Sequence, residues 1–350
     1  MKMMKIIAFF NNKGGVSKTT TCFNVGWKMA QLGKNVLMID LDPQCNLTGS
    51  ALEVGQSGLL PKDYQSYAQS NLHSALKPAM KGTGEKIKTP DVIKVRNQER
   101  LWILPGNVRM AEVETQLATA MNMGAVMPAM QNVPGSFGNL YTLLNKKYKL
   151  DYILLDLSPS LGALNQVNLL LSDYFIVPMM PDIFSVMAID SLSRVLPDWA
   201  RWAEKINRLE LFDDRDMIYK FTPSTPKFLG TVVQNYNVRN KLPTQSFRRY
   251  MESLQNAVVE TLIPALSDAG MVLNDNVYSQ YDVKYELAEI PNFNSLIATA
   301  QTCGKPIYQL AESELTTSGA AAKGQMENVL KFNEIFTNLA KQITGTIEAI

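Results

Sequence analysis

The sequence predicts an α/β fold, a doubly wound and mostly parallel twisted sheet that is flanked by helices. Short apolar runs typical of buried strands alternate along the chain with segments whose apolar residues recur at helical spacing. The first strand and the first helix are joined by a turn rich in glycine and lysine, and two other strands run into an aspartate. A chain of 350 residues can bury one large core or two small ones.

A strand, a glycine-rich turn and a helix follow one another near the N-terminus. The apolar run from Met4 to Phe10 is the strand, and apolar residues recur at helical spacing from Cys22 to Leu32. In such an arrangement, backbone N–H groups and the positive end of the helix dipole point at one small volume. The sequence therefore predicts a phosphate-binding loop made of Lys13, Gly14, Gly15, Val16, Ser17, Lys18, Thr19 and Thr20.

This loop departs from the strict pattern G-x-x-x-x-G-K-[ST], which needs glycine at positions 12 and 17. The chain has Asn12 and Ser17 there, and a second lysine, Lys13, stands at the front of the loop. Lys18 is predicted to reach the β- and γ-phosphates of a nucleotide, and the hydroxyl of Thr19 to hold Mg²⁺.

Carboxylates follow two of the predicted strands. The second strand ends on Asp40, with Asp42 two residues later in the run D-x-D-P-Q, and a later strand ends on Asp156. Ligands of doubly wound sheets bind at the carboxyl ends of the strands, where these side chains stand. Four apolar residues before Asp156 give it the Walker B form, so that it can hold Mg²⁺ through water opposite Thr19.

The remaining elements follow the same alternation. Strands are expected at residues 34–40, 151–156, 173–178 and 228–236, a short strand and turn at 101–107, and helices at 108–119, 184–196 and 326–343. Residues 55–98 are polar and weakly periodic, which predicts an irregular or partly helical insertion. Residues 204–227 are charged and then rich in proline, which predicts a second insertion at the surface.

Composition excludes several classes of function. A net charge of +2 gives no overall polyelectrolyte character that would argue for DNA binding by itself. The cysteines Cys22, Cys45 and Cys303 have no paired spacing, and the single histidine, His73, excludes most histidine-based catalysis. No apolar run approaches the ~20 residues of a membrane span. We therefore expect a cytoplasmic protein with no membrane partner.

The loop resembles the deviant Walker A motif of the ParA/MinD family, K-G-G-x-x-K-[ST]-[ST], and the chain is most similar to its ParA/Soj-type partition ATPases. The run D-x-D-P-Q matches the family's switch I segment, and the residues after Asp156 resemble switch II, with Ser158 in place of its first proline. The resemblance covers nearly the whole chain. It implies a single P-loop NTPase domain over residues 1–350, with the insertions near 55–98 and 204–227.

The same resemblance implies roles for the site residues, with ATP and Mg²⁺ as ligands. Lys13 would cross a dimer interface to touch the partner's nucleotide, and Asp42 would orient the attacking water. The predicted catalytic residues are then Lys13, Asp42 and Lys18, and the predicted metal site consists of Thr19, Asp156 and, as a supporting group, Asp40.

Base and DNA contacts are also implied by the resemblance. The residues placed beside the adenine are Asn235, Pro291 and Asn292, and those placed on DNA are Arg239, Lys241, Arg248 and Arg249. The chain departs from the family pattern after Ile290-Pro291, because Asn292 and Ser295 stand where arginines are expected. This departure weakens the expectation of nonspecific DNA contact.

Two functions remain open at this point. The first is an ATPase that is slow alone, forms a sandwich homodimer with ATP, binds nonspecific DNA, and is stimulated by an adaptor protein of ParB type. Such a protein would drive DNA segregation or cargo positioning and would associate with the nucleoid. The second is a regulatory ATP switch that docks on partner proteins without binding DNA. A MinD-like membrane cycle is disfavoured, because the final helix carries few basic residues.

Overall fold

A computed structural model of the chain describes residues 3–52, 70–82, 85–124, 130–213, 217–239, 242–243 and 245–350. Its main sheet contains β1 (Lys5–Phe9), β2 (Val36–Asp40), β3 (Ile93–Lys94), β4 (Leu101–Leu104), β5 (Tyr152–Asp156), β6 (Tyr174–Met179), β7 (Lys227–Tyr236) and β10 (Glu286–Pro291). Two further short strands, β8 (Val238–Arg239) and β9 (Leu242–Pro243), form a separate antiparallel pair.

The order of the strands in the main sheet is β10-β7-β6-β1-β5-β2-β4-β3. All neighbours are parallel except β3 and β4. From β1 the strands β6, β7 and β10 follow outward on one side, whereas on the other side β5 inserts between β1 and β2. Strands β2 and β5 are buried over their whole length, as strands covered on both faces must be. The predicted doubly wound, mostly parallel sheet is confirmed.

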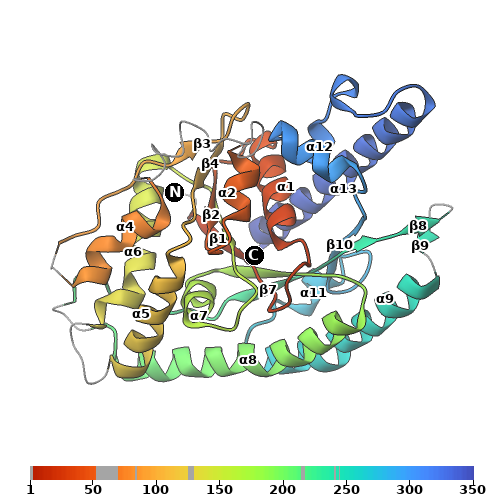
Figure 1. The fold of residues 1–350 in the computed structure, drawn as a ribbon. Coiled ribbons are helices and arrows are strands. Elements are labelled where there is room, and N and C mark those ends of the chain that lie inside the picture. The colour runs from red at the N-terminus through yellow and green to blue at the C-terminus, as the bar shows by residue number, and fades with distance from the viewer. Residues whose placement is uncertain are drawn as a thin grey trace.

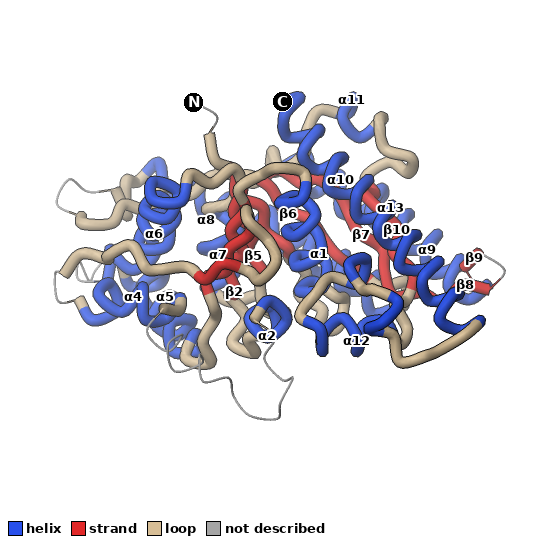
Figure 2. The backbone as a smooth tube through the Cα atoms, turned by 90° about the horizontal axis from the view of Figure 1, so that it is seen from above, coloured by secondary structure: helices blue, strands red, loops and turns tan. Residues whose placement is uncertain are grey.

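Helices cover both faces of the sheet. The longer ones are α1 (Lys18–Gln31), α4 (Leu72–Lys81), α5 (Met110–Met123), α6 (Asn132–Tyr148), α8 (Ile183–Arg208), α9 (Gln245–Ala257) and α13 (Ala320–Ala349). The shorter ones are α2 (Asn46–Ala51), α7 (Ala163–Leu170), α10 (Ile263–Asp268), α11 (Asp275–Tyr278) and α12 (Leu296–Cys303). Figure 1 shows α1, α12 and α13 above the sheet, with α8 and α9 running together below it. Figure 2 shows the strands enclosed between these helices.

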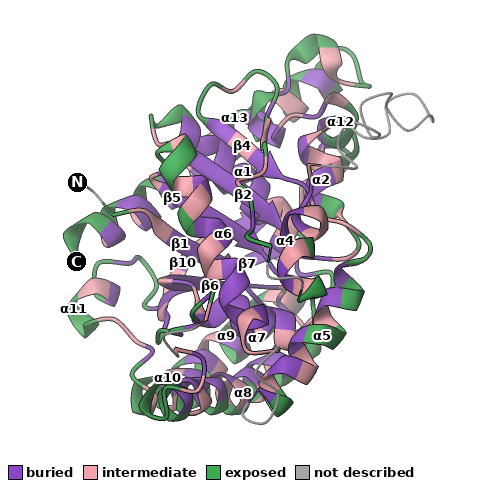
Figure 3. Cartoon of the chain, turned by 90° about the vertical axis from the view of Figure 1, so that its left-hand side faces the viewer, coloured by how far each residue is buried: buried purple, intermediate pink, exposed green. Residues whose placement is uncertain are grey.

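The core is continuous through the sheet and the inner sides of the helices. Figure 3 shows the buried residues gathered on the central strands, while exposed residues mark the outer sides of the surrounding helices. Phe9, Phe175 and Phe336 are among the largest side chains that are fully buried. The carboxyl ends of β1, β2 and β5 therefore emerge from a rigid centre, which fixes the loops that follow them.

Helix α8 is longer than the sequence predicts. The sequence predicts a helix over residues 184–196, which ends just before Pro197, a residue that cannot donate a backbone hydrogen bond. In the structure α8 continues through Pro197 to Arg208, and Trp199 and Ala203 beyond the proline are buried. Burial of this apolar stripe against the protein outweighs the one lost hydrogen bond.

The predicted surface insertion 204–227 is also different in the structure. Its first residues belong to the last turn of α8, and Phe212 and Phe221 are buried, with their ring centroids 6.1 Å apart. The hydroxyl oxygen of Tyr219 accepts a hydrogen bond of 2.6 Å from the backbone N–H of Ile87. The two predicted insertions therefore pack against each other where they are described, and residues 55–69 lie outside the described part of the chain.

The C-terminal helix α13 packs against α1, the helix that follows the predicted phosphate loop. It is longer than the predicted 326–343, and Phe336 and Ile343 on its inner side are fully buried. Lys28 of α1 is 5% exposed; it donates to Asn333 Oδ1 of α13 at 2.6 Å and lies 4.1 Å from the ring centroid of Tyr308. Burial lowers the pKa of Lys28 to about 8.

Replacing Lys28 with methionine should change how stability depends on pH. The folded-state pKa of Lys28 lies below its unfolded value, so the folded chain binds fewer protons between about pH 8 and 10.5. The contribution of Lys28 to the free energy of unfolding therefore rises with pH in this window, by up to about 3 kcal/mol. Urea unfolding of wild type and Lys28→Met at pH 7 and pH 10.5 measures this difference. Lys341→Met, at an exposed lysine of α13, is the control, and an equal pH response in both variants would contradict the assignment.

Candidate functional site

The turn between β1 and α1 has the form of a phosphate-binding loop. Gly15 has φ +75° and Ser17 has φ +58°, so two residues of the loop lie in the left-handed region. Ser17 is the residue that immediately precedes α1, and it occupies the position where the strict motif has glycine. The structure therefore explains that preference, because glycine adopts a positive φ without steric cost.

Lys18, Thr19 and Asp156 converge at the start of α1. The hydroxyl of Thr19 donates to Asp156 Oδ2 at 2.7 Å, and Lys18 Nζ donates to the carbonyl oxygen of Lys13 at 3.1 Å. Burial lowers the pKa of Lys18, although the charges of Asp156 and Asp42 oppose this shift. Burial, and then the charge of Asp40, raise the pKa of Asp156 well above its usual range.

These residues fit a bound Mg²⁺. Asp156 Oδ1 is buried and has no hydrogen-bond partner, and a neighbouring hydroxyl from Thr19 adds a second oxygen ligand. Among the described residues no group of three or more His, Cys, Asp and Glu side chains could hold a metal. A magnesium ion here would therefore complete its shell with water and with oxygens of a phosphate ligand, as Mg²⁺ commonly does.

Asp40 and Asp42 organise the turn after β2. Asp40 is fully buried, and its Oδ2 accepts hydrogen bonds from the backbone N–H of Thr48 at 2.8 Å and from its hydroxyl at 2.7 Å. Burial raises the pKa of Asp40 to about 6, although the bonds from Thr48 oppose this shift. Asp40 Oδ1 accepts from the backbone N–H of Asp42 at 3.2 Å. Asp40 therefore holds Asp42 at the edge of the site, and Thr48 is a residue that the sequence analysis missed.

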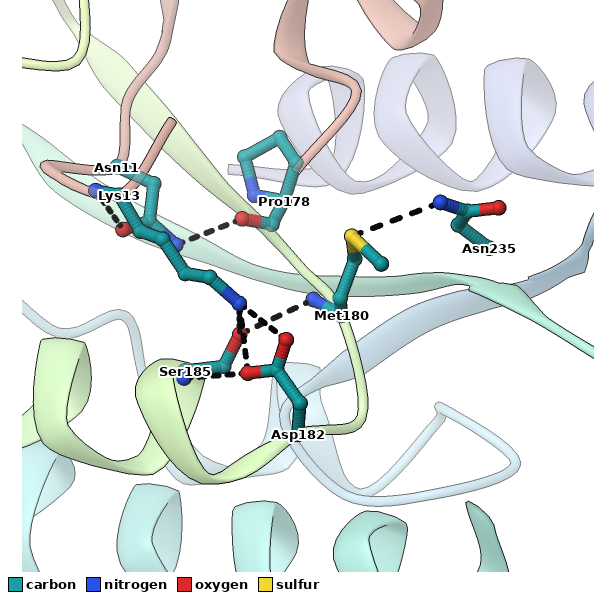
Figure 4. Close-up of polar contacts among 7 residues, drawn as sticks. All are labelled: Asn11, Lys13, Pro178, Met180, Asp182, Ser185 and Asn235. Atoms are coloured by element: carbon teal, nitrogen blue, oxygen red, sulfur yellow. Dashed lines mark hydrogen bonds and ion pairs between the residues drawn. The ribbon is translucent and has the colours of Figure 1, made fainter. Parts of the chain in front are cut away.

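The front lysine of the loop is held within its own chain. Lys13 Nζ contacts both carboxylate oxygens of Asp182, with Oδ1 at 2.6 Å, and donates to Ser185 Oγ at 3.1 Å (Figure 4). Asp182 is the N-cap of α8 and accepts from the backbone N–H of Ser185 at 2.8 Å. Partial burial opposes ionisation of Asp182, but the bond from Lys13 and the bond from Ser185 lower its pKa.

Comparison with known proteins identifies the family of the chain. A family model described as an AAA domain matches residues 4–207, more than half of the chain. The sporulation initiation inhibitor protein Soj of Bacillus subtilis is 27% identical over 263 residues, which are 75% of this chain and 85% of Soj. The chain belongs to the ParA/MinD family of P-loop ATPases.

Solved structures share the fold of this ParA/MinD-family chain. Protein DIP2308 from Corynebacterium diphtheriae gives a TM-score of 0.62 at 23% identity, with 86% of this chain and 97% of that protein covered. The structure of pNOB8 ParA bound to nonspecific DNA gives a TM-score of 0.54 at 17% identity, with 99% of both chains covered. The fold therefore extends over nearly the whole chain.

The predicted adenine residues lie together in this ParA/MinD-family fold. Asn292 Nδ2 donates to Asn235 Oδ1 at 2.7 Å, and Asn235, with φ +66°, is the penultimate residue of β7. Asn235 Nδ2 also lies 3.6 Å from the sulfur of Met180 (Figure 4). Pro291 and Asn292 line a cavity of about 650 Å³, which α13 closes on one side with Lys331. Their contact with a base stays a prediction.

The predicted DNA residues are only partly described. Arg248 and Arg249 are exposed on the first turns of α9, which packs against α8. Arg239 belongs to the short strand β8, and Lys241 lies outside the described residues. The structure therefore shows Arg248 and Arg249 as exposed neighbours on one helix, and all four DNA assignments stay predictions.

In the part of the chain that the structure describes, no helix combines the length and the apolarity that a membrane span needs.

Replacing Asp156 with asparagine should remove most of the gain in ATP affinity that Mg²⁺ provides. The amide has the shape of the carboxylate but lacks the charge, so the gain should fall by about tenfold or more. Titration with a fluorescent ATP analogue, in magnesium and in EDTA, measures the gain. Asp198→Asn, at an exposed carboxylate of α8, is the control. A full magnesium effect in Asp156→Asn would remove this residue from the metal site.

Proposed function

We propose that this chain is a partition-type ATPase that forms a sandwich dimer with ATP and uses it to drive DNA segregation or cargo positioning. The observation that carries the proposal is the arrangement of one phosphate loop with two lysines, Lys18 facing inward beside Asp156 and Lys13 at the outer edge. Membership of the ParA/MinD family and the similarity to Soj support it.

Each residue has a role in this proposal. Lys18 and the N–H groups of the loop bind the β- and γ-phosphates, and Thr19 and Asp156 hold Mg²⁺, which neutralises charge on the transferred phosphoryl group. Asp42 orients the attacking water, and Asp40 keeps Asp42 in place through its backbone N–H. Lys13 supplies positive charge to the nucleotide of the partner copy, so hydrolysis depends on the dimer.

The surface around Lys13 supports a dimer face. Ile183, Phe184 and Met187, on the first turns of α8, are exposed apolar side chains, and Phe184 is 64% exposed. The ammonium group of Lys13 lies 5.9 Å from the ring centroid of Phe184. A second copy that covers this face would bury apolar surface and would meet Lys13 at the same time. Release of Lys13 from Asp182 is then a step in forming the dimer.

The DNA part of the proposal rests on Arg248 and Arg249, which are adjacent and exposed on α9. The solved structure of pNOB8 ParA, a protein of the same fold, is bound to nonspecific DNA. In this proposal an adaptor protein of ParB type stimulates ATP hydrolysis by the chain. The second candidate is a regulatory ATP switch that docks on proteins without DNA. It is favoured by the uncharged Asn292 and Ser295, which stand where the family pattern has arginines.

The two lysines should respond differently to replacement. Lys18→Ala should weaken ATP binding by about tenfold or more, because it removes a phosphate ligand from a buried site. Lys13→Ala should leave ATP binding nearly unchanged and should remove ATP-dependent dimerisation and hydrolysis. Nucleotide titration, light scattering and a phosphate-release assay measure these three properties. Lys34→Ala, which breaks a surface ion pair with Glu348, is the control. Equal loss of binding in both variants would mean that Lys13 is a second phosphate ligand of its own chain.

The double variant Arg248→Ala, Arg249→Ala should weaken ATP-dependent DNA binding about equally for all sequences, because phosphate contacts carry no base information. With roughly two to four phosphate contacts per subunit, a wild-type dimer should show a log–log salt slope of about −4 to −7. Fluorescence anisotropy on short duplexes at several salt concentrations measures both quantities.

A matched control exists on α8, where Arg194 and Arg201 are exposed but each is paired with an aspartate, Asp190 or Asp198. Replacing both with alanine should leave the affinity for DNA nearly unchanged. If Arg248→Ala, Arg249→Ala also binds like wild type, the DNA face lies elsewhere. If wild type binds no DNA at low salt, the protein-switch function is the better one.

A further inference from the structure

A glutamine from a distant strand contacts the backbone of the phosphate loop. Gln234 lies near the end of β7, which is separated from β1 by the intervening strand β6. Its side-chain Nε2 donates to the carbonyl oxygen of Val16 at 2.7 Å, and its Oε1 lies 3.0 Å from the hydroxyl of Thr21. Gln234 is 1% exposed, so water does not compete for these bonds.

The contact meets the loop where its backbone is strained. Ser17 has φ +58° and ψ +32°, a conformation that is unfavourable for residues other than glycine. Ser17 is also the N-cap of α1, yet its side chain makes no capping hydrogen bond. Its own side chain therefore does not stabilise the turn, and the support must come from the groups around it.

Two side chains, those of Gln234 and Thr21, contact the backbone carbonyl oxygens next to this strained residue. Gln234 binds the carbonyl oxygen of Val16, which precedes Ser17, and its Nε2 lies 3.4 Å from the carbonyl oxygen of Ser17. The hydroxyl of Thr21 lies 2.9 Å from the Ser17 carbonyl oxygen and contacts Gln234 on its other side. These two buried side chains, Gln234 and Thr21, support the turn at Ser17, and we call them the brace.

We propose that Gln234 is a positioning residue that holds the phosphate loop in its binding conformation in place of the glycine that the strict loop motif has at position 17. This proposal rests on one part of the proposed function, namely that the loop binds ATP. Gln234 acts through the backbone carbonyls of Val16 and Ser17 and need not touch the nucleotide. Without this brace the loop would relax to a more ordinary φ, and its N–H groups would no longer converge on the phosphates.

The test combines removal of the brace with removal of the strain. Gln234→Met keeps the length of the side chain and removes both of its polar groups. Its affinity for a fluorescent ATP analogue should fall about tenfold or more, because a strained non-glycine residue has lost its support. Ser17→Gly is the reference for the double variant, because glycine adopts this φ freely and residue 17 then needs no support from the brace. The double variant should recover affinity to within about threefold of Ser17→Gly.

Two further variants separate positioning from general stability. Thr21→Val removes the other half of the brace and should cause a smaller loss of ATP affinity that Ser17→Gly also suppresses; it decides the question if Gln234→Met does not fold. Thr231→Val removes a buried hydroxyl from the same strand, where Thr231 contacts the carbonyl oxygen of Tyr285. It should lower the thermal midpoint without changing ATP affinity.

The outcomes distinguish this proposal from the proposed function. If wild type does not bind ATP, the proposed function fails. If wild type binds ATP and Gln234→Met binds equally well, the positioning role alone is wrong. The positioning role is also wrong if Gln234→Met loses affinity and Ser17→Gly does not suppress the loss, because the glutamine then does not act through the strained turn.

Discussion

The site depends on the burial of charge at the carboxyl edge of the sheet. Lys18, Asp40, Asp42 and Asp156 are each less than 10% exposed, so three carboxylates share a site with one ammonium group. Burial of charge without full compensation is unfavourable, which is why the pKa of Asp40 and that of Asp156 are raised. A divalent cation beside Asp156 would favour the ionised carboxylates, so metal and nucleotide restore a balance of charge that the chain alone lacks.

Side chains from distant elements hold the loop that would bind this nucleotide. Asp182 of α8 fixes Lys13 at the front of the loop. Gln234 of β7 contacts the loop backbone near the end of the loop, at the carbonyl oxygen of Val16. The first contact is an ion pair at a partly exposed position, whereas the second is buried and uncharged. The front of the loop can therefore be released at modest cost, because exposed ion pairs are weak, while the end stays fixed.

The sequence predicts those parts of the molecule that depend on neighbouring residues. The buried strands, the loop 13–20 and the aspartates after β2 and β5 all have local patterns, and the structure has β1, β2 and β5 as adjacent strands. The partners of those residues could not be predicted, because Asp182 and Gln234 are separated from the loop by 169 and 218 positions. Helix α8 was predicted too short because local chemistry at Pro197 argues for an end, whereas tertiary packing decides.

The brace formed by Gln234 and Thr21 has a consequence for turnover of the chain in a cell. With Gln234 as the positioning residue proposed above, the loop would be complete only when β7 has joined the sheet, and a nucleotide would then recognise the assembled fold and not a fragment of it. A ligand that binds only the folded state stabilises it by about 2.7 kcal/mol when its concentration is 100 times its Kd. The opening of β7, and with it exposure of the chain to proteases, would then decrease as the nucleotide supply increases.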